Sequence, residues 1–158
     1  NEQGDHAAAL GIAQQQIADR EALHGIDSPR VAVDWNNLGQ TLVLLERSAE
    51  AEHALRRALA LIDADPQSPE SRRVYLLSGI ANAEIGQGYL DRARDSATEA
   101  LAISQRTLGA WHQLTLRSVN SLAAAQLLAG DYAGVIAGAS RLRAAPPDVD
   151  RHSLKTGL

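Results

Sequence analysis

The side chains best suited to binding in this sequence are amides. Asn36 and Asn37 follow Trp35 in the stretch VAVDWNNLG, and Asn82 and Asn120 come later in the chain. An amide both donates and accepts hydrogen bonds, so a row of asparagines can bind the backbone of an extended peptide whatever its sequence. Asn37, Asn82 and Asn120 are therefore predicted to form such a ladder. The alternative is that the amides bond to one another or to neighbouring helices as structural contacts.

Two arginines and a tryptophan are the next candidates for contact with a partner. Arg73 and Arg117 lie near the starts of predicted helices, where their planar guanidinium groups could hold a carboxylate from an acidic or C-terminal segment. Solvation by water is the alternative for both. Trp111 precedes a predicted helix and is either a local hydrophobic staple or an exposed anchor, whereas Trp35 is expected in the core.

Residues for catalysis or for metal binding are not grouped in this sequence. Without cysteine there is no thiol nucleophile, Cys-based zinc site or disulfide, and no glycine-rich phosphate loop precedes a strand. Asp63 and Asp65 are expected to hydrogen-bond to the backbone at a helix end and not to form a metal site. The histidines show no HExxH spacing and lie at His6, His24, His53, His112 and His152. We therefore expect no catalytic residue, no metal and no cofactor in this segment.

Composition restricts the fold and the partner classes. The length of 158 residues suits one domain. A content of 45% hydrophobic but only 3% aromatic residues favours closely packed helices and therefore an all-α fold. A net charge of -4 argues against nucleic acid as a partner. There is no apolar run of the roughly 18 residues that span a bilayer and no basic secretory start, so we expect no membrane contact and a cytoplasmic location. The absence of methionine suggests a segment of a longer protein.

The elements that must position these side chains form a repeat with an offset of 42 residues. A repeated order of large and small apolar residues is a packing pattern for antiparallel helices, because small residues let two helices approach closely. Gly88 and Gly130 also align, each where a helical hairpin needs a turn. The aligned sets are Trp35, Leu77 and Val119; Leu38, Ile80 and Leu122; Gly39, Ala81 and Ala123; Ala51, Ala93 and Val135; and Ala58, Ala100 and Leu142.

This pattern predicts a solenoid over residues 5–145 with about three and a half repeats. The repeats lie near 29–63, 69–105 and 111–144, after a half-repeat at 5–23 whose first helix is absent. Residues 146–158 are predicted to be a C-terminal cap or a disordered tail. Seven helices are expected, near 5–23, 29–46, 48–63, 69–87, 89–105, 111–129 and 131–144.

Four segments resemble the tetratricopeptide repeat in the 42-residue form found in kinesin light chains and in bacterial multidomain regulatory proteins. ALHGIDSPRVAVDWNNLG at 22–39 is similar to the family's inter-repeat signature, and TLGAWHQLTLRSVNSLA at 107–123 is a degraded copy. AEHALRRALALI at 51–62 and GYLDRARDSATEALAI at 88–103 resemble second helices. The resemblance implies a right-handed α-solenoid of antiparallel helix hairpins.

In this family the first helix of each repeat lines the concave surface. By position, the resemblance places seven of the candidates in that groove. Arg73 and Trp111, at the starts of predicted helices, are expected as possible edge contacts. The groove residues are Asn36, Asn37, Gln40, Tyr75, Asn82, Arg117 and Asn120. The sequence departs from the asparagine pair in two repeats, where Ser78 with Gly79 and Ser121 stand instead. A peptide groove of the family type could therefore be partly lost.

The resemblance implies a non-catalytic protein-protein interaction module that binds a peptide segment or a neighbouring domain. Because repeats of this form occur in bacterial multidomain proteins, the resemblance also implies that the module is the regulatory or sensory part of a larger bacterial protein, such as a Ser/Thr kinase or a transcription regulator. The alternative is a structural spacer or a self-association module, because the half-repeat leaves an apolar flank that could pair in a homo-oligomer. The expected partner is a protein or peptide.

Overall fold

The computed structural model describes the backbone of residues 2–144 and the side chains of residues 8–144. Within these residues the chain forms seven α-helices, one short 3-10 helix and no β-strand, which confirms the predicted all-α repeat fold. The predicted tail at 146–158 lies outside the described residues. The elements are α1 Glu2–His24, η1 Pro29–Val31, α2 Ala32–Leu44, α3 Ser48–Asp63, α4 Glu70–Gly86, α5 Leu90–Thr107, α6 Gln113–Leu128 and α7 Tyr132–Ala144.

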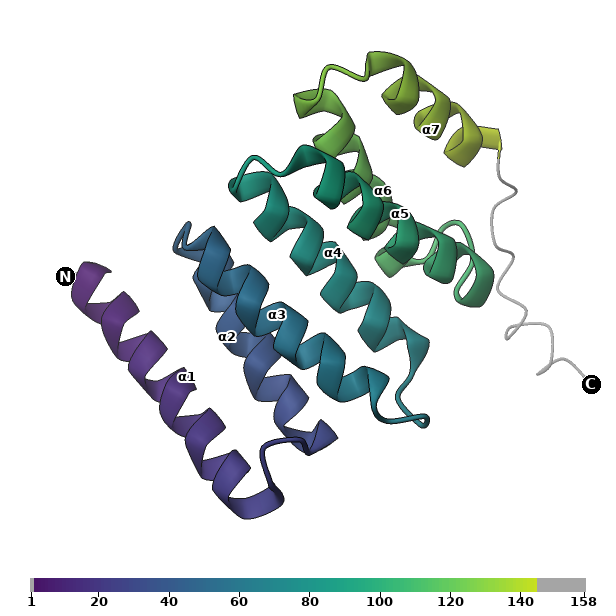
Figure 1. Cartoon of the computed structure of the whole chain (residues 1–158). Helices are drawn as coiled ribbons and strands as arrows, with labels where there is room; N and C mark the ends of the chain where they lie inside the picture. Colours follow the sequence, from purple (N-terminus) through teal and green to yellow (C-terminus); the bar gives the residue numbers. More distant parts are fainter. Residues whose placement is uncertain (1, 145–158) are drawn as a thin grey trace, which may run out of the picture.

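Successive helices form hairpins that stack from α1 at one end to α7 at the other (Figure 1). Helix α4 packs against both α2 and α6, so these three helices form one continuous layer, here called the inner layer. Helices α1, α3 and α5 pack against inner helices and form an outer layer. The backbones of these outer helices do not contact one another, although the Arg92 side chain of α5 reaches Glu52 of α3.

One turn position recurs in every hairpin and explains where the inner helices end. Gly88 and Gly130 both have a φ of +77°, a left-handed conformation that glycine adopts without a Cβ clash. The equivalent residue in the first hairpin is Glu46, which takes a φ of +58°. The first inner helix therefore ends at Leu44, two residues before the predicted end, because residue 46 must leave the helical region.

One leucine of the core packs between two glycines. Leu55 of α3 is 0% exposed, and a Cβ placed on Gly39 of α2 would lie 2.6 Å from its Cγ. A Cβ on Gly79 of α4 would lie 3.2 Å from its Cδ1. Three helices can meet this closely only because both facing residues lack a side chain.

A cluster of charged side chains joins the outer helices α3 and α5 to the inner helix α4. Glu84 is fully buried and accepts hydrogen bonds from Arg56 at 2.7 Å and from the Ser96 hydroxyl at 2.8 Å. Glu52, also buried, accepts from Arg56 and Gln87, each at 2.7 Å. Arg92 contacts both carboxylates. These charges are tolerated in the interior because each is paired and hydrogen-bonded.

This cluster predicts a pH dependence of stability. Burial raises the pKa of Glu52, but hydrogen bonds from Arg56 and Gln87 and the positive charges of Arg56 and Arg92 outweigh it, so the pKa lies below the ordinary 4.5. A carboxyl with a lowered folded-state pKa stabilises the fold above its unfolded-state pKa, and this contribution is lost as pH falls through the folded-state pKa. Below about pH 4.5 we therefore expect the parent protein to lose stability more steeply than Glu52→Gln. Urea unfolding at a series of pH values measures the two slopes, and equal slopes would contradict the assignment.

Candidate functional site

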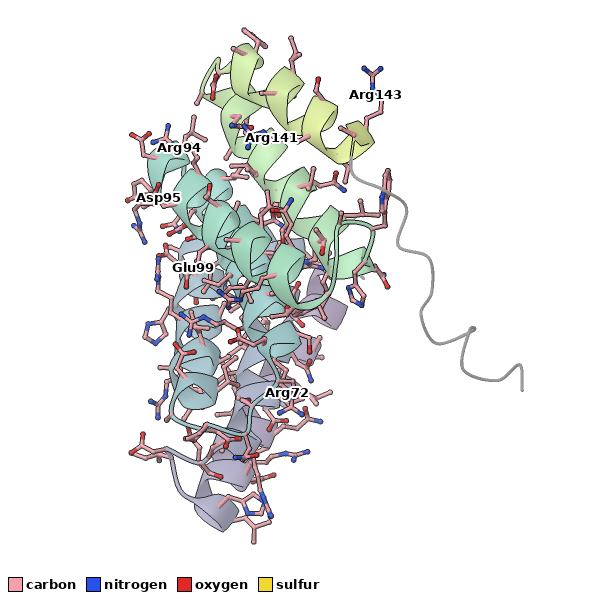
Figure 2. All side chains as sticks on the ribbon, turned by 90° about the vertical axis from the view of Figure 1, so that its right-hand side faces the viewer. Arg72, Arg94, Asp95, Glu99, Arg141 and Arg143 are labelled. Carbon is pink, nitrogen blue, oxygen red and sulfur yellow. The ribbon has the colours of Figure 1, made fainter. Side chains whose placement is uncertain are left out.

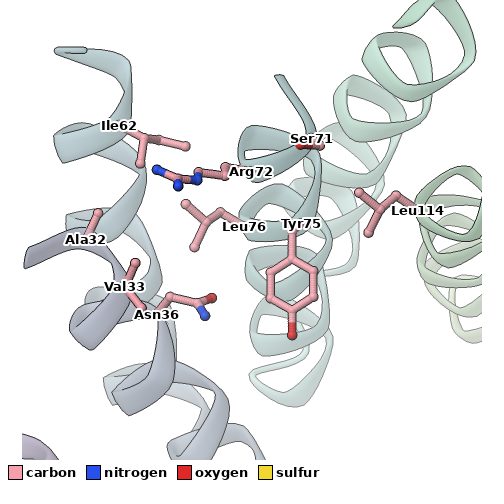
Figure 3. Close-up of a pocket in the computed structure, with 9 residues that line it drawn as sticks. All are labelled: Ala32, Val33, Asn36, Ile62, Ser71, Arg72, Tyr75, Leu76 and Leu114. Carbon is pink, nitrogen blue, oxygen red and sulfur yellow. The ribbon is translucent and has the colours of Figure 1, made fainter. Parts of the chain in front are cut away.

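A pocket of about 230 Å³ opens on the inner layer between α2 and α4. Figure 3 shows Arg72 and Leu76 projecting from α4 toward Ile62, with Val33 and Asn36 on the facing helix and Tyr75 on the near side of α4. The lining is mainly apolar. It consists of Ala32, Val33, Asn36, Ile62, Ser71, Arg72, Tyr75, Leu76 and Leu114.

A second pocket, of about 500 Å³, lies between α4 and α6 and is more polar. Tyr75 and Leu114 line both pockets, so the two are adjacent on the inner layer and are together called the inner groove. The second pocket is lined by Tyr75, Asn82, Gln113, Leu114, Leu116, Arg117, Asn120 and Ser121.

The inner groove is positively charged although the chain as a whole is acidic. Its lining contains Arg72 and Arg117 but no aspartate or glutamate. Neither arginine forms an ion pair within the described part of the chain, and Arg117 stacks with its guanidinium carbon 4.3 Å from the centre of the Tyr75 ring. Stacking on an aromatic ring holds the guanidinium in place without using its hydrogen-bond donors. The groove therefore offers donors that suit a carboxylate.

Four polar atoms of the inner layer are buried without a hydrogen-bond partner among the described residues. One of them, Oδ2 of Asp34, forms an ion pair with Nε of Arg20 at 2.9 Å. The others are the Asn36 side-chain oxygen, the Gln40 side-chain nitrogen and Nε of Arg117. A buried polar group left unpaired costs roughly 1–3 kcal/mol. Asn36 and Arg117 line the groove, and their unpaired atoms are an acceptor and a donor, as a bound peptide backbone would require.

The structure separates the three asparagines of the predicted ladder. Asn82 and Asn120 line the same pocket, where Asn82 accepts a 3.0 Å hydrogen bond from the Ser121 hydroxyl. Asn37 is exposed, lines neither pocket, and accepts a 3.4 Å hydrogen bond from Asn36. The offset of 42 gives the reason, because Asn37 is equivalent to Gly79 and Ser121 and not to the other two asparagines. The three side chains consequently do not form one row.

The two predicted edge contacts lie outside the inner groove. Arg73 is paired with Asp63 at 2.7 Å and with Glu99 at 2.8 Å, so it bridges α3, α4 and α5. Trp111, 41% exposed, precedes α6 and lines neither pocket of the groove. Sequence reasoning chose Arg73 and missed its neighbour Arg72, which does line the groove. The sequence contained a signal for Arg72, because residues three apart lie on the same face of a helix and Arg72 lies three residues before the groove residue Tyr75.

No group of three histidine, cysteine or acidic side chains among the described residues is placed to hold a metal ion. None of the described helices has the length and apolar character needed to pass through a bilayer.

The stacked helical hairpins, whose inner helices line one groove, define this chain as a helical-repeat protein. Two tetratricopeptide repeat family models match it, one over residues 1–64 and one over residues 74–113. The chain therefore belongs to the tetratricopeptide repeat family, whose repeats mediate protein-protein interaction.

Solved structures support the same fold. The chain is similar to the nearly identical TPR-like repeats of a Podosopora anserina protein described as a kinesin light chain, with a TM-score of 0.75 and 20% identity. That match, to a single-substitution variant, covers 90% of this chain and 67% of the other. A second structure of those repeats gives a TM-score of 0.73, with the same identity and coverage. No curated protein matches the sequence significantly.

Proposed function

We propose that the inner groove binds an extended segment of a partner protein that carries an apolar side chain and, beyond it, a carboxylate. The observation that carries this proposal is that a mainly apolar pocket lies beside a more polar one, and that the two are lined by two arginines without a carboxylate partner among the described residues. The apolar side chain enters beside Leu76, and the carboxylate is held by Arg117. The unpaired Asn36 oxygen accepts a hydrogen bond from the bound backbone.

The same proposal places this non-catalytic module in the regulatory part of a larger bacterial protein, such as a Ser/Thr kinase or a transcription regulator, acting in the cytoplasm. The 42-residue repeat length, resembling the form common in such proteins, supports it. The groove then binds a segment of the same protein or of another protein that signals to it. The sequence surrounding this segment in the whole gene product tests this assignment.

A peptide library of extended, capped nonapeptides tests groove binding directly. We expect bound peptides to be enriched in aspartate or glutamate near an apolar residue. Arg117→Ala should weaken a selected peptide by about tenfold or more, because a charge-assisted hydrogen bond is lost. The matched control is Arg94→Ala, an outer-layer arginine well away from Arg72 (Figure 2) that pairs only with Asp91 among the described residues. Fluorescence anisotropy measures the affinities, and equal losses for the two variants would contradict the groove assignment.

Self-association is the second candidate function, and a specific surface favours it. Helix α7 packs only against α6 among the described helices and contains no buried residue. The end of this last hairpin exposes four large apolar side chains, Leu127, Leu128, Tyr132 and Ile136. Sedimentation velocity over a range of concentrations separates the two functions, since the groove proposal holds for a monomer.

A further inference from the structure

A third hollow, of about 520 Å³, lies in the outer layer between α1 and α3 and is here called the outer cleft. The backbones of these two helices do not contact each other, and α2 forms the bottom of the space between them. Its floor includes the buried side chains of Ile17, Leu38 and Ala54. The full lining is Gln14, Ile17, Ala18, Glu21, Trp35, Leu38, Ala49, Glu50, His53 and Ala54.

The repeat itself shows what fills this space one unit further along the solenoid. Between α3 and α5 the equivalent space holds Arg56 and Arg92, which bind the carboxylates of Glu52 and Glu84. With the offset of 42, Gln14 stands at the position of Arg56, and Glu50 stands at the position of Arg92. The two cations that close the second junction are thus replaced by an amide and an acid at the first. The space that they would fill is open.

The outer cleft has the chemistry to take a cation from outside. Glu21 accepts a 3.3 Å hydrogen bond from the Trp35 indole nitrogen, which leaves its carboxylate with acceptor positions to spare. Glu50 also lines the cleft and is paired with Arg47, which is not a lining residue. No lysine or arginine is among the lining residues. The cleft is therefore acidic, opposite in sign to the inner groove.

An aromatic wall completes the cleft. Trp35 was expected in the core, but it is only partly buried and lines the cleft, with the His53 ring edge-on at a centroid distance of 6.3 Å. An indole ring is the best aromatic partner for a guanidinium or ammonium group. The apolar floor suits the methylene stem of a long basic side chain, which packs on apolar surface while its charged end meets a carboxylate.

We propose that the outer cleft is a second interaction site, which takes an arginine side chain presented by a basic segment of a partner protein. The arginine stem lies on Leu38 and Ala54, and its guanidinium group stacks against Trp35 and donates hydrogen bonds to Glu21. The external arginine thereby fills the space that Arg56 and Arg92 fill at the next junction, but it pairs with Glu21, because Leu10 and Leu42 stand at the positions of Glu52 and Glu84. This site is distinct from the inner groove and selects a partner of the opposite charge.

The test uses Trp35 as its own reporter. Trp111→Phe leaves Trp35 as the sole tryptophan, because the chain has two. The probes are three capped alanine-rich peptides that differ only at the central residue, which is arginine, citrulline or glutamate. We expect the arginine peptide to change the Trp35 fluorescence with a saturable dependence on concentration. The citrulline peptide has the same shape but no charge, and its affinity should be lower by at least about tenfold. The glutamate peptide should not bind.

Two variants locate the binding in the outer cleft. Gln14→Arg places a guanidinium in the cleft from within, as Arg56 does one repeat later, and should abolish the response while the thermal midpoint is kept. Glu21→Gln should weaken the arginine peptide about tenfold, and it stays informative if Gln14→Arg fails to fold. Arg117→Ala, in the inner groove, should leave the response unchanged.

Several outcomes would overturn the proposal. The first is the absence of any saturable response to the arginine peptide, and the second is equal binding of the citrulline peptide. A full response in folded Gln14→Arg, or in Glu21→Gln, would show that the peptide binds elsewhere. Loss of the response in Arg117→Ala would assign it to the inner groove.

Discussion

Replacing Glu84 by alanine should remove about 3 kcal/mol of stability, among the largest losses of any single charged residue in the described part of the chain. Its carboxylate is fully buried in α4 and is contacted by Arg56 at 2.7 Å, by Arg92 at 3.3 Å and by the Ser96 hydroxyl at 2.8 Å. Breaking a buried ion pair from one side costs roughly 3–5 kcal/mol, because the remaining charge is left uncompensated. We expect the lower end of that range, since both arginines are about half exposed and keep Glu52 as a partner.

The matched control is Glu99→Ala. Glu99 also accepts from an arginine, Arg73 at 2.8 Å, but the Glu99 side chain is 47% exposed whereas that of Glu84 is fully buried, and Figure 2 shows Glu99 on the outside of the molecule. An exposed ion pair contributes at most about 1 kcal/mol. Urea unfolding of the two variants at neutral pH gives the comparison. Losses of similar size would show that the cluster around Glu84 is no more than a surface ion pair.

The repeat offset predicted the fold well because it depends on side-chain size, which the sequence states directly. Leu38, Gly39 and their equivalents repeat the same large and small volumes, and a helix hairpin is the arrangement that packs them. The helix over 48–63 has the predicted ends. The predicted helix from residue 29 is divided, because Pro29 begins a 3-10 turn capped by Ser28 before α2 starts at Ala32.

The inner groove was less predictable because its lining depends on helix phase. Tyr75, Arg117 and Asn120 were named from the sequence and do line it, whereas Asn37 does not. In an α-helix neighbouring residues point about 100° apart, so one step along the chain separates Arg72 in the groove from Arg73 outside it. A prediction by residue type alone cannot resolve that step.

The outer cleft could not have been predicted from spacing, because it depends on how far two helices stand apart. What the sequence does contain is the substitution of Gln14 and Glu50 for Arg56 and Arg92 at equivalent positions. That exchange is visible only once the role of the two arginines is known. It then indicates where the first junction leaves space for a long basic side chain.

Leu55→Ala should cost about 3 kcal/mol or more, because its side chain fills the meeting point of three helices. Leu55 is 0% exposed and packs against the backbone at Gly39 and Gly79. Neither glycine has a side chain that could move into the space, so the cavity left by the truncation should stay open, and leucine-to-alanine changes in such cores cost roughly 2–5 kcal/mol. The control is Leu44→Ala, since Leu44 is 83% exposed and its truncation should change stability by less than about 0.5 kcal/mol. Chemical denaturation of both variants decides the matter, and a loss for Leu55→Ala as small as that for Leu44→Ala would mean that the three helices do not meet at this residue.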